Sequence, residues 1–421
     1  MKSNRQPDKS NRQPDVREGA IPPLRELQAA LRRITETLAR ELAQPTRTVP
    51  SWSDQDWILA RAVAAMHGVA PLLWSNLRWQ GPGDWMSFLE QQASHTRRRH
   101  ARVMELLRLL DRRCAEEGIA AAALKGAALH AMGLYRAGER PMADIDVLVR
   151  PVDAERAAAM LRSLGFRESA TTWKEREFTP QGNGVLAVLG EHTDNHIKIE
   201  LHERIGEKFP FRITTLTERI FPVMPYAGLN DYPSRAALMF HLLFHAAGAM
   251  ALGSLRLLHL NDLALLGSRL EPREWDEIFE SGSREPLWWA LPPLRLTSRY
   301  YESRIPAYVL ARASQDCPRV LTKLTASHSL TDVSYSRLRI DAFPGVEWSE
   351  SVPLALKYVW NRFRPPPEHI AWRARARSTG WAAGSEWPAM SQRRRILKWL
   401  GSRPARPAAM HAVRAAFSAR Q

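Results

Sequence analysis

Two acidic side chains, two residues apart, open an otherwise apolar stretch of the chain. Asp144 and Asp146 occur in RPMADIDVLVR, residues 140–150. Side chains at positions i and i+2 of a β-strand point to one face, so these carboxylates lie side by side while Ile145 and Val147 face the core. A divalent ion with oxygen ligands, Mg²⁺ or Mn²⁺, relieves the repulsion between such carboxylates. The pattern predicts a metal site, and the simpler alternative is a turn followed by a solvated edge strand.

Neighbouring residues favour the metal site. Lys125 and Gly126 stand at a strand-to-helix junction, where free backbone N–H groups bind anions, glycine lets a phosphate approach and lysine adds charge. Arg140 lies just ahead of the acidic pair, and Glu200 lies in a later strand-like run, HIKIELH. The candidate catalytic and metal-binding residues are Asp144, Asp146 and Glu200, and the candidate phosphate-binding residues are Lys125, Gly126 and Arg140.

Some polar residues also have structural interpretations. Lys125 could extend along the start of a helix, and Arg140 could pair with one of the aspartates. His202 shares the strand face of Glu200 and is a further candidate for the site. Glu191 and Asp194, in the loop GEHTDNH, compete with Glu200 as the third acid, although loop positions hold a ligand less rigidly.

Two histidines and one aspartate lie on apolar helices after residue 233. His241 and His245 are four residues apart, the spacing of a helical zinc site, but no Glu follows His241 and no third ligand is evident. We therefore expect both histidines in the core or behind the site. Asp262, in HLNDLALL, is expected to cap a helix or to pair with His259 or an arginine.

The elements that must position these residues form a small α/β unit over residues 116–225. The run GIAAAALKG reads as a buried strand, AALHAMGLY as a short helix and ADIDVLVR as a strand. A helix follows, DAERAAAMLRSLGF, and then three strand-like runs, REFTP, GVLAVLG and HIKIELH. The order β-α-β-α-β-β-β predicts a mixed sheet.

On both sides of this unit, the apolar residues recur at the spacing of α-helices. Residues 21–115 are expected to form a helical domain, with helices at 24–45, after the cap Ser53, in GVAPLLWSNL and at 94–117. Residues 226–365 are expected to form a second helical domain that begins with SRAALMFHLLFHAAGAMA. The predicted fold class is α+β, a small mixed-sheet core flanked by helical domains.

The chain ends carry a different composition. The net charge is +16, and from Arg373 onward eleven Lys and Arg residues face one acid, Glu386, so +10 of that charge lies in the last 49 residues. We expect residues 366–421 to form a basic Arg/Pro-rich tail, ordered at MSQRRRILKWLGS and frayed elsewhere. Such a tail favours contact with nucleic acid or another acidic surface, and a solvated Arg-rich end is the alternative.

Other features narrow the class of protein. Residues 1–20 repeat the heptad KSNRQPD without an apolar stretch, which predicts a disordered tail and no signal peptide. Two distant cysteines, Cys114 and Cys317, exclude a disulfide framework and favour a reducing cytoplasm. The uncharged segment 236–255 has the length of a membrane span, but its histidines and glycines favour a buried helix, so we expect no membrane span.

The ordered motifs resemble a known family. Lys125-Gly126, Arg140, Asp144-Ile145-Asp146 and Glu200-Leu201-His202 are similar, in this order, to motifs of nucleotidyltransferases of the DNA polymerase β superfamily. The similarity is greatest to a bacterial branch labelled "nucleotidyltransferase family protein", and it spans residues 50–270. The sequence departs from the superfamily at Ala127, where a serine hydroxyl is usual, and at Glu200, where aspartate is common.

The resemblance implies a two-metal reaction. Asp144 and Asp146 would bridge both ions, and Glu200 would hold the ion beside the acceptor. An acceptor hydroxyl would then attack the α-phosphorus of an NTP, and pyrophosphate would leave. Lys125, Gly126 and Arg140 would neutralise the triphosphate.

Two other functions remain open on the sequence. A degenerate nucleotidyltransferase could act as an RNA- or protein-binding module through its basic tail. A toxin-like transferase could modify tRNA or protein side chains. The acceptor hydroxyl, whether of a sugar, an aminoglycoside-like molecule, an RNA end or a protein, is not determined by these motifs.

Overall fold

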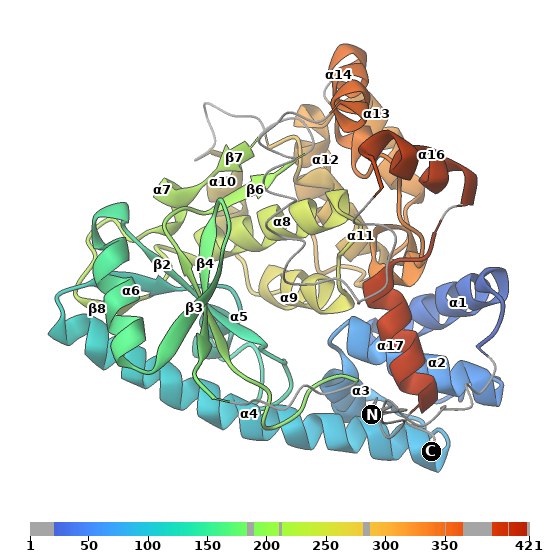
Figure 1. The fold of residues 1–421 in the computed structure, drawn as a ribbon, viewed down its shortest axis with the longest axis horizontal. Helices are drawn as coiled ribbons and strands as arrows, with labels where there is room; N and C mark the ends of the chain where they lie inside the picture. The colour runs from blue at the N-terminus through green and yellow to red at the C-terminus, as the bar shows by residue number, and fades with distance from the viewer. Residues whose placement is uncertain are drawn as a thin grey trace, which may run out of the picture.

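A computed structural model shows how the chain folds (Figure 1). The structure describes residues 21–182, 189–209, 213–280, 287–349, 351–364, 390–402 and 404–418. The expected disordered tail at 1–20 and most of the expected strand GVLAVLG lie outside these residues. Within them, a mixed sheet with its own helices stands beside a larger body of helices, so the predicted α+β class is confirmed.

The sheet has six strands in the order β3-β4-β5-β2-β1-β8. Strand β2 pairs with β5 in parallel and with β1 antiparallel, and β8 joins the far side of β1 in parallel. A separate two-stranded sheet pairs β6 with β7. The strands are β1 (Ala120–Ala123), β2 (Asp144–Val149), β3 (Phe166–Thr171), β4 (Glu175–Pro180), β5 (Lys198–His202), β6 (Gly206–Lys208), β7 (Ile213–Thr215) and β8 (Gly228–Asn230).

The strand β8 extends the sheet past the boundary predicted at residue 225. Its three residues, Gly-Leu-Asn, carry no alternating pattern, so pairing with β1 rather than local sequence makes them a strand. The Asn230 side chain fixes this edge by donating to the carbonyl oxygens of Ala121 and Tyr226, each at 2.9 Å.

The two faces of the sheet pack against different helices. Ile145, Val147 and Val149 of β2 are buried with residues of α4 (Gly83–Glu116) and α6 (Ala154–Ser163). The intervening residues, Asp146 and Leu148, point to the opposite face, where Leu148 joins the core of the helical body. The side chains of β2 therefore alternate between the two faces of the sheet, as predicted, and the face that carries the acids points toward the helical body.

The N-terminal helices follow the predicted pattern with one extension. The helices α1 (Leu24–Ala43), α2 (Asp54–Met66) and α3 (Ala70–Asn76) precede α4. Ser53 caps α2 as predicted, because its Oγ accepts from the Asp56 N–H at 3.2 Å and the Asp56 carboxylate accepts from the Ser53 N–H. The helix predicted at 94–117 begins eleven residues earlier, at Gly83, and runs along the whole base of the view in Figure 1.

The helices after the sheet complete the larger body. The helix α5 (Gly126–Ala131) belongs to the sheet unit, because it connects β1 to β2 along the chain. The later helices are α7 (Thr217–Ile220), α8 (Arg235–Ala251), α9 (Leu257–Gly267), α10 (Pro272–Glu280), α11 (Leu291–Tyr300), α12 (Ala307–Asp316), α13 (Arg319–Ser327), α14 (Val352–Phe363), α16 (Gln392–Ser402) and α17 (Pro407–Ser418).

Residues 366–389 of the predicted basic tail lie outside the described residues, and the described part of the tail forms two helices. The helix α16 lies at the expected MSQRRRILKWLGS segment, but α17 was expected to be frayed and instead packs against α2. Ala409, Val413 and Ala416 of α17 are buried there. An apolar face at helical spacing outweighs the solvation of the surrounding arginines.

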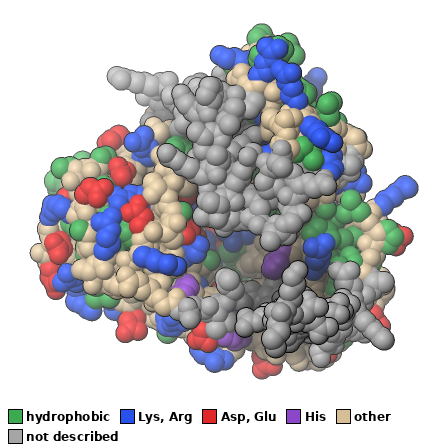
Figure 2. Space-filling view, in the orientation of Figure 1, with side chains coloured by type: hydrophobic (Ala, Val, Ile, Leu, Met, Phe, Trp, Pro, Cys, Tyr) green, Lys and Arg blue, Asp and Glu red, His purple; other side chains and the backbone are tan. Residues whose placement is uncertain are grey.

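Figure 2 shows hydrophobic and basic side chains gathered at the end of the molecule formed by α14 and α16.

The apolar segment 236–255 lies mostly in α8, whose side chains are largely buried. Among the residues that the structure describes, no single helix is long and apolar enough to cross a membrane. The helices α2 and α3 pass the same test only as a pair, across a bend of 111°.

A buried histidine links α2 to α9. Nδ1 of His67 accepts from the Leu257 N–H at 3.0 Å, and its Nε2 lies 2.9 Å from Ser336 Oγ. Burial, with a smaller effect from Arg256, lowers the pKa of His67 to about 3. The unfolded chain binds this proton below pH 6.5 and the folded chain only below pH 3, so acid in this range favours unfolding.

When the pH falls from 7 to 5, we expect the protonation of His67 in the unfolded chain to lower the unfolding free energy by about 2 kcal/mol. Urea unfolding of the wild type and of His67→Gln at both pH values measures this contribution. The variant should lose less stability on acidification, because the other buried histidines titrate in both proteins. Equal losses in the two proteins would contradict the assignment.

Candidate active site

The acidic face of β2 meets the neighbouring strand β5 in register. Because β2 and β5 are parallel, Asp146 stands opposite Glu200, and the two side chains point to the same face. One ligand atom each from Asp146, Glu200 and His202 lies within 4.8 Å of the other two. The third acid predicted from the sequence, Glu200, therefore lies beside Asp146, whereas Asp144 is not a member of this cluster of ligand atoms. Glu191 pairs instead with Arg99 at 2.9 Å.

Lys125 and His202 both contact one carboxylate oxygen of Asp146. Lys125 Nζ lies 2.6 Å from Asp146 Oδ1, and His202 Nε2 lies 3.0 Å from the same oxygen. Burial by itself would raise the pKa of Asp146, but Lys125 and His202 outweigh burial and hold it well below its usual range. Burial and then the charge of Asp146 raise the pKa of Asp144. The pair therefore differs in electrostatic environment, with Asp146 the more firmly ionised.

The backbone of Lys125 has an uncommon conformation. Its φ of 46° and ψ of −109° are unfavourable for a residue with a Cβ. The Lys125 N–H donates to the Tyr232 hydroxyl at 3.2 Å, and that hydroxyl lies 2.7 Å from Nδ1 of His241. Burial holds the pKa of His241 well below its usual value, so its neutral ring accepts from Tyr232. His241 thus supports the site from the core, as expected.

Gly126 is packed directly beneath Arg140. A Cβ at residue 126 would collide with Arg140 Nη1 and would lie 2.8 Å from Met142 Sδ. The absence of a side chain at this position therefore lets the start of α5 approach Arg140. The structure supplies this reason for glycine alongside the predicted approach of a phosphate.

Gly126→Ala should lower the unfolding free energy by about 1–3 kcal/mol, because the methyl group overpacks the contact with Arg140 and Met142. Gly83→Ala is a matched control, since Gly83 also begins a helix and a Cβ there meets no atom within 4 Å. Denaturant unfolding of the two variants measures the difference. Equal stability of the two variants would show that the contact tolerates a methyl group.

Arg140 forms a buried ion pair with a helix of the larger body. Its Nε and Nη2 donate to the two carboxylate oxygens of Asp262 on α9 at 2.9 and 2.8 Å. The Tyr135 hydroxyl donates to Asp262 at 2.6 Å and accepts from the Asn261 amide at 2.8 Å. The sequence suggested one of the two aspartates as the structural partner of Arg140, and the partner is Asp262 instead.

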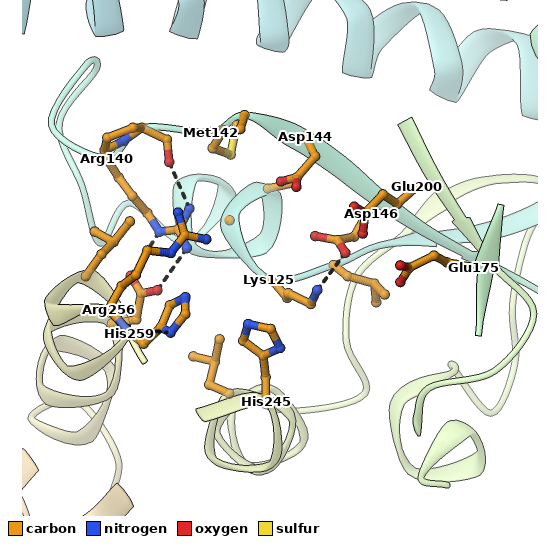
Figure 3. Close-up of a pocket in the computed structure, with 18 of the residues that line it drawn as sticks. Lys125, Arg140, Met142, Asp144, Asp146, Glu175, Glu200, His245, Arg256 and His259 are labelled. Carbon is orange, nitrogen blue, oxygen red and sulfur yellow. Dashed lines mark hydrogen bonds and ion pairs between the residues drawn. The ribbon is translucent and has the colours of Figure 1, made fainter. Parts of the chain in front are cut away.

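All six predicted site residues line one cavity of about 240 Å³. Figure 3 shows the acids on one side of it and Arg140, Arg256 and His259 on the other, with Lys125 reaching Asp146. Burial holds the pKa of His259 well below its usual value and lowers that of His245. The cavity is lined by charged, polar and apolar side chains, a mixture common in ligand sites.

Several cavity residues were missed in the sequence. Glu175 begins β4 in the run KEREF, and its relation to the site depends on strand pairing, because it stands opposite His202. Lys174 precedes it, and Arg256 directly precedes α9. An arginine just before an apolar helix was the available signal for Arg256. Glu175 and Lys174 had no local signal beyond strand alternation.

The donor set suits a divalent ion. Asp146 and Glu200 offer carboxylate oxygens and His202 a ring nitrogen, and Asp144 lies two residues before Asp146 on the same strand face. Carboxylates suit Mg²⁺ and Mn²⁺, and imidazole is a common ligand of transition ions. The residues present therefore fit divalent metal binding.

Comparison with known proteins agrees with this chemistry. No curated protein and no solved structure matches the chain. A family model described as "Uncharacterised nucleotidyltransferase" matches residues 53–291, more than half of the chain. This range includes the sheet, α8, α9 and the whole acidic cavity, and it confirms the resemblance to nucleotidyltransferases inferred from the motifs. The chain therefore belongs to this family of nucleotidyltransferases, which are transferases of phosphorus-containing groups.

Proposed function

We propose that the protein transfers an NMP unit from an NTP to a hydroxyl acceptor and releases pyrophosphate, with Mg²⁺ or Mn²⁺ as the metal. The observation that carries the proposal is the register of β2 and β5, which sets Glu200 beside Asp146. Asp144, Asp146 and Glu200 are the metal ligands in this proposal. The buried free thiols of Cys114 and Cys317 are consistent with action in the cytoplasm.

The charges around the cavity support a triphosphate ligand. Lys125 is paired with Asp146, Arg140 with Asp262, and Lys174 lies 3.4 Å from Glu175. Arg256 also lines the cavity, and no ion pair joins it to another residue that the structure describes. Arg256 therefore keeps its positive charge available for a phosphate, whereas Arg140 is already neutralised by Asp262.

The chain's own residues have separate roles in the transfer. A bound divalent ion supplies Lewis acidity to the α-phosphate and lowers the pKa of the acceptor hydroxyl. In this proposal Glu200 takes the hydroxyl proton while the acceptor oxygen forms its bond to the α-phosphorus. The bond between the α-phosphorus and the bridging oxygen to the β-phosphorus then breaks, and pyrophosphate leaves with that electron pair. Lys125 and Arg256 offset the charge of the leaving group, and Gly126 leaves room beside it.

The function is tested with α-labelled and γ-labelled NTPs. The protein is incubated with each of the four NTPs, Mg²⁺ or Mn²⁺, and a cell extract divided into small-molecule, RNA and protein fractions. We expect the α-label, but not the γ-label, to pass to one fraction, with release of pyrophosphate that EDTA stops. Transfer of the γ-label, or α-label transfer that persists in EDTA, would contradict the proposal.

A degenerate nucleotidyltransferase that binds RNA is the second candidate. Two observations favour it: Ala127 lacks a hydroxyl, and α16 carries the exposed side chains of Arg393, Arg394 and Lys398. Contact of the basic C-terminal region with nucleic acid is part of this proposal. RNA binding whose affinity is unchanged by EDTA, together with no turnover of any NTP, would favour this candidate over the enzyme.

A further inference from the structure

A carboxylate outside the predicted site stands behind His202. Glu175 of β4 is the antiparallel partner of His202 of β5, so both side chains lie on the acidic face of the sheet. Glu175 Oε2 is buried and accepts no hydrogen bond from any residue that the structure describes. Lys174 Nζ lies 3.4 Å from this oxygen and His202 Nδ1 lies 3.9 Å from it. A buried carboxylate oxygen without a donor is costly unless it acquires one.

The ring of His202 lies between this carboxylate and the candidate metal ligands. Its Nδ1 faces Glu175, and its Nε2 lies 3.0 Å from Asp146 Oδ1 and 3.7 Å from Glu200 Oε2. Adjacent ligands of an octahedral ion with bonds of about 2.1 Å are about 3 Å apart. The separation of Nε2 from Asp146 Oδ1, which is a hydrogen bond in the structure, equals that of two neighbouring ligands of one ion.

We propose that His202 Nε2 is a metal ligand, that Glu175 orients the ring by accepting a hydrogen bond from Nδ1–H, and that the site consequently prefers Mn²⁺ to Mg²⁺. A proton on Nδ1 leaves the Nε2 lone pair for the metal and gives Glu175 Oε2 the donor that it lacks. This inference rests on the metal dependence of the proposed function and deepens it by naming the ion.

The metal preference follows from the nitrogen ligand. Mg²⁺ is bound almost wholly by oxygen, whereas first-row transition ions accept imidazole. Among those ions, Mn²⁺ also suits the carboxylates of Asp146 and Glu200. An imidazole added to the carboxylates therefore distinguishes Mn²⁺ from Mg²⁺ in a way that carboxylates alone do not.

Pulsed EPR of Mn²⁺ bound to the full-length protein, without nucleotide, tests the nitrogen ligand directly. We expect electron spin echo modulation from a coordinated ¹⁴N nucleus, replaced by the ¹⁵N pattern in protein labelled at histidine. His202→Gln should abolish the modulation, whereas His245→Gln, a change at another histidine of the cavity, should retain it. Bound Mn²⁺ without nitrogen modulation in the wild type would overturn the proposal, whether or not the variants fold.

The role of Glu175 is tested by metal affinity. Glu175→Gln should weaken Mn²⁺ binding by about 10–100-fold, the usual effect of removing a carboxylate behind a histidine ligand. Glu177→Gln is the matched control, since Glu177 shares the strand and the face but is bound by Lys198 at 2.9 Å. Isothermal titration with Mn²⁺ and with Mg²⁺ measures both affinities. Equal affinity of wild type for the two ions, or equal losses in the two variants, would overturn the assignment.

These experiments separate the inference from the proposed function. Nitrogen modulation without NMP transfer to any acceptor would support the metal site while contradicting the transferase reaction. NMP transfer by a protein whose bound Mn²⁺ shows no nitrogen ligand would support the reaction and remove His202 from the metal site.

Discussion

Asp146→Asn should reduce the rate of NMP transfer at least about 10³-fold, equivalent to about 4 kcal/mol of transition-state stabilisation. Asparagine has the same shape as aspartate but offers one neutral oxygen, so the variant would bind the proposed divalent ion more weakly and lose the polarisation of the α-phosphate that this ion would supply. The variant also leaves Lys125 buried without its counter-ion. The rate is measured by transfer of α-label at saturating NTP and metal.

The control for this variant is Asp153→Asn. Asp153 follows the same strand but pairs with Arg156 at 2.8 Å and does not line the cavity. It should keep the wild-type rate, since a surface ion pair contributes little. Circular dichroism and the melting temperature of Asp146→Asn show whether the fold persists. A folded Asp146→Asn protein with undiminished transfer would remove this carboxylate from the reaction.

Asp262→Asn should lower the free energy of unfolding by about 3–5 kcal/mol, because it leaves the guanidinium of Arg140 buried and unpaired. The pair is almost fully enclosed, with 2% exposure of the Asp262 side chain and 10% of Arg140. Asp262 also accepts the hydroxyl of Tyr135, so the change weakens a network that joins the sheet unit to α9. Urea unfolding monitored by tryptophan fluorescence measures the loss.

The double variant Arg140→Met/Asp262→Asn separates the structural and substrate roles of Arg140. Removing the unpaired charge should restore most of the stability that Asp262→Asn loses. If Arg140 also binds the triphosphate, the restored protein should show a raised KM for NTP. A double variant no more stable than Asp262→Asn would show that the ion pair is not what stabilises this contact.

The sequence alone determined the local geometry of the site. Strand alternation set Asp144 and Asp146 on one face and Ile145 and Val147 on the other. Ser53 was expected to cap the helix that follows it, and it caps α2, which starts at Asp54. These features depend on backbone periodicity and on contacts between residues a few positions apart, which the sequence states directly.

The sequence also indicated a site residue that is distant along the chain from Asp144 and Asp146. This was possible because the motifs occur in the same order as in a known family, whose strand arrangement they imply. Glu200 was expected beside the acidic pair, and the parallel pairing of β2 with β5 puts it there. The buried α8 and the mixed sheet were likewise expected and are present.

Only the tertiary structure decided which side chains meet across elements. Arg140 pairs with Asp262, 122 residues away, and Lys125 is fixed by Tyr232, 107 residues away. Glu175 stands behind His202 because β4 pairs with β5 in one register, and α17 is ordered because α2 offers it an apolar face. Such contacts depend on how whole strands and helices pack, and sequence periodicity fixes the faces of an element but not the neighbour that covers each face.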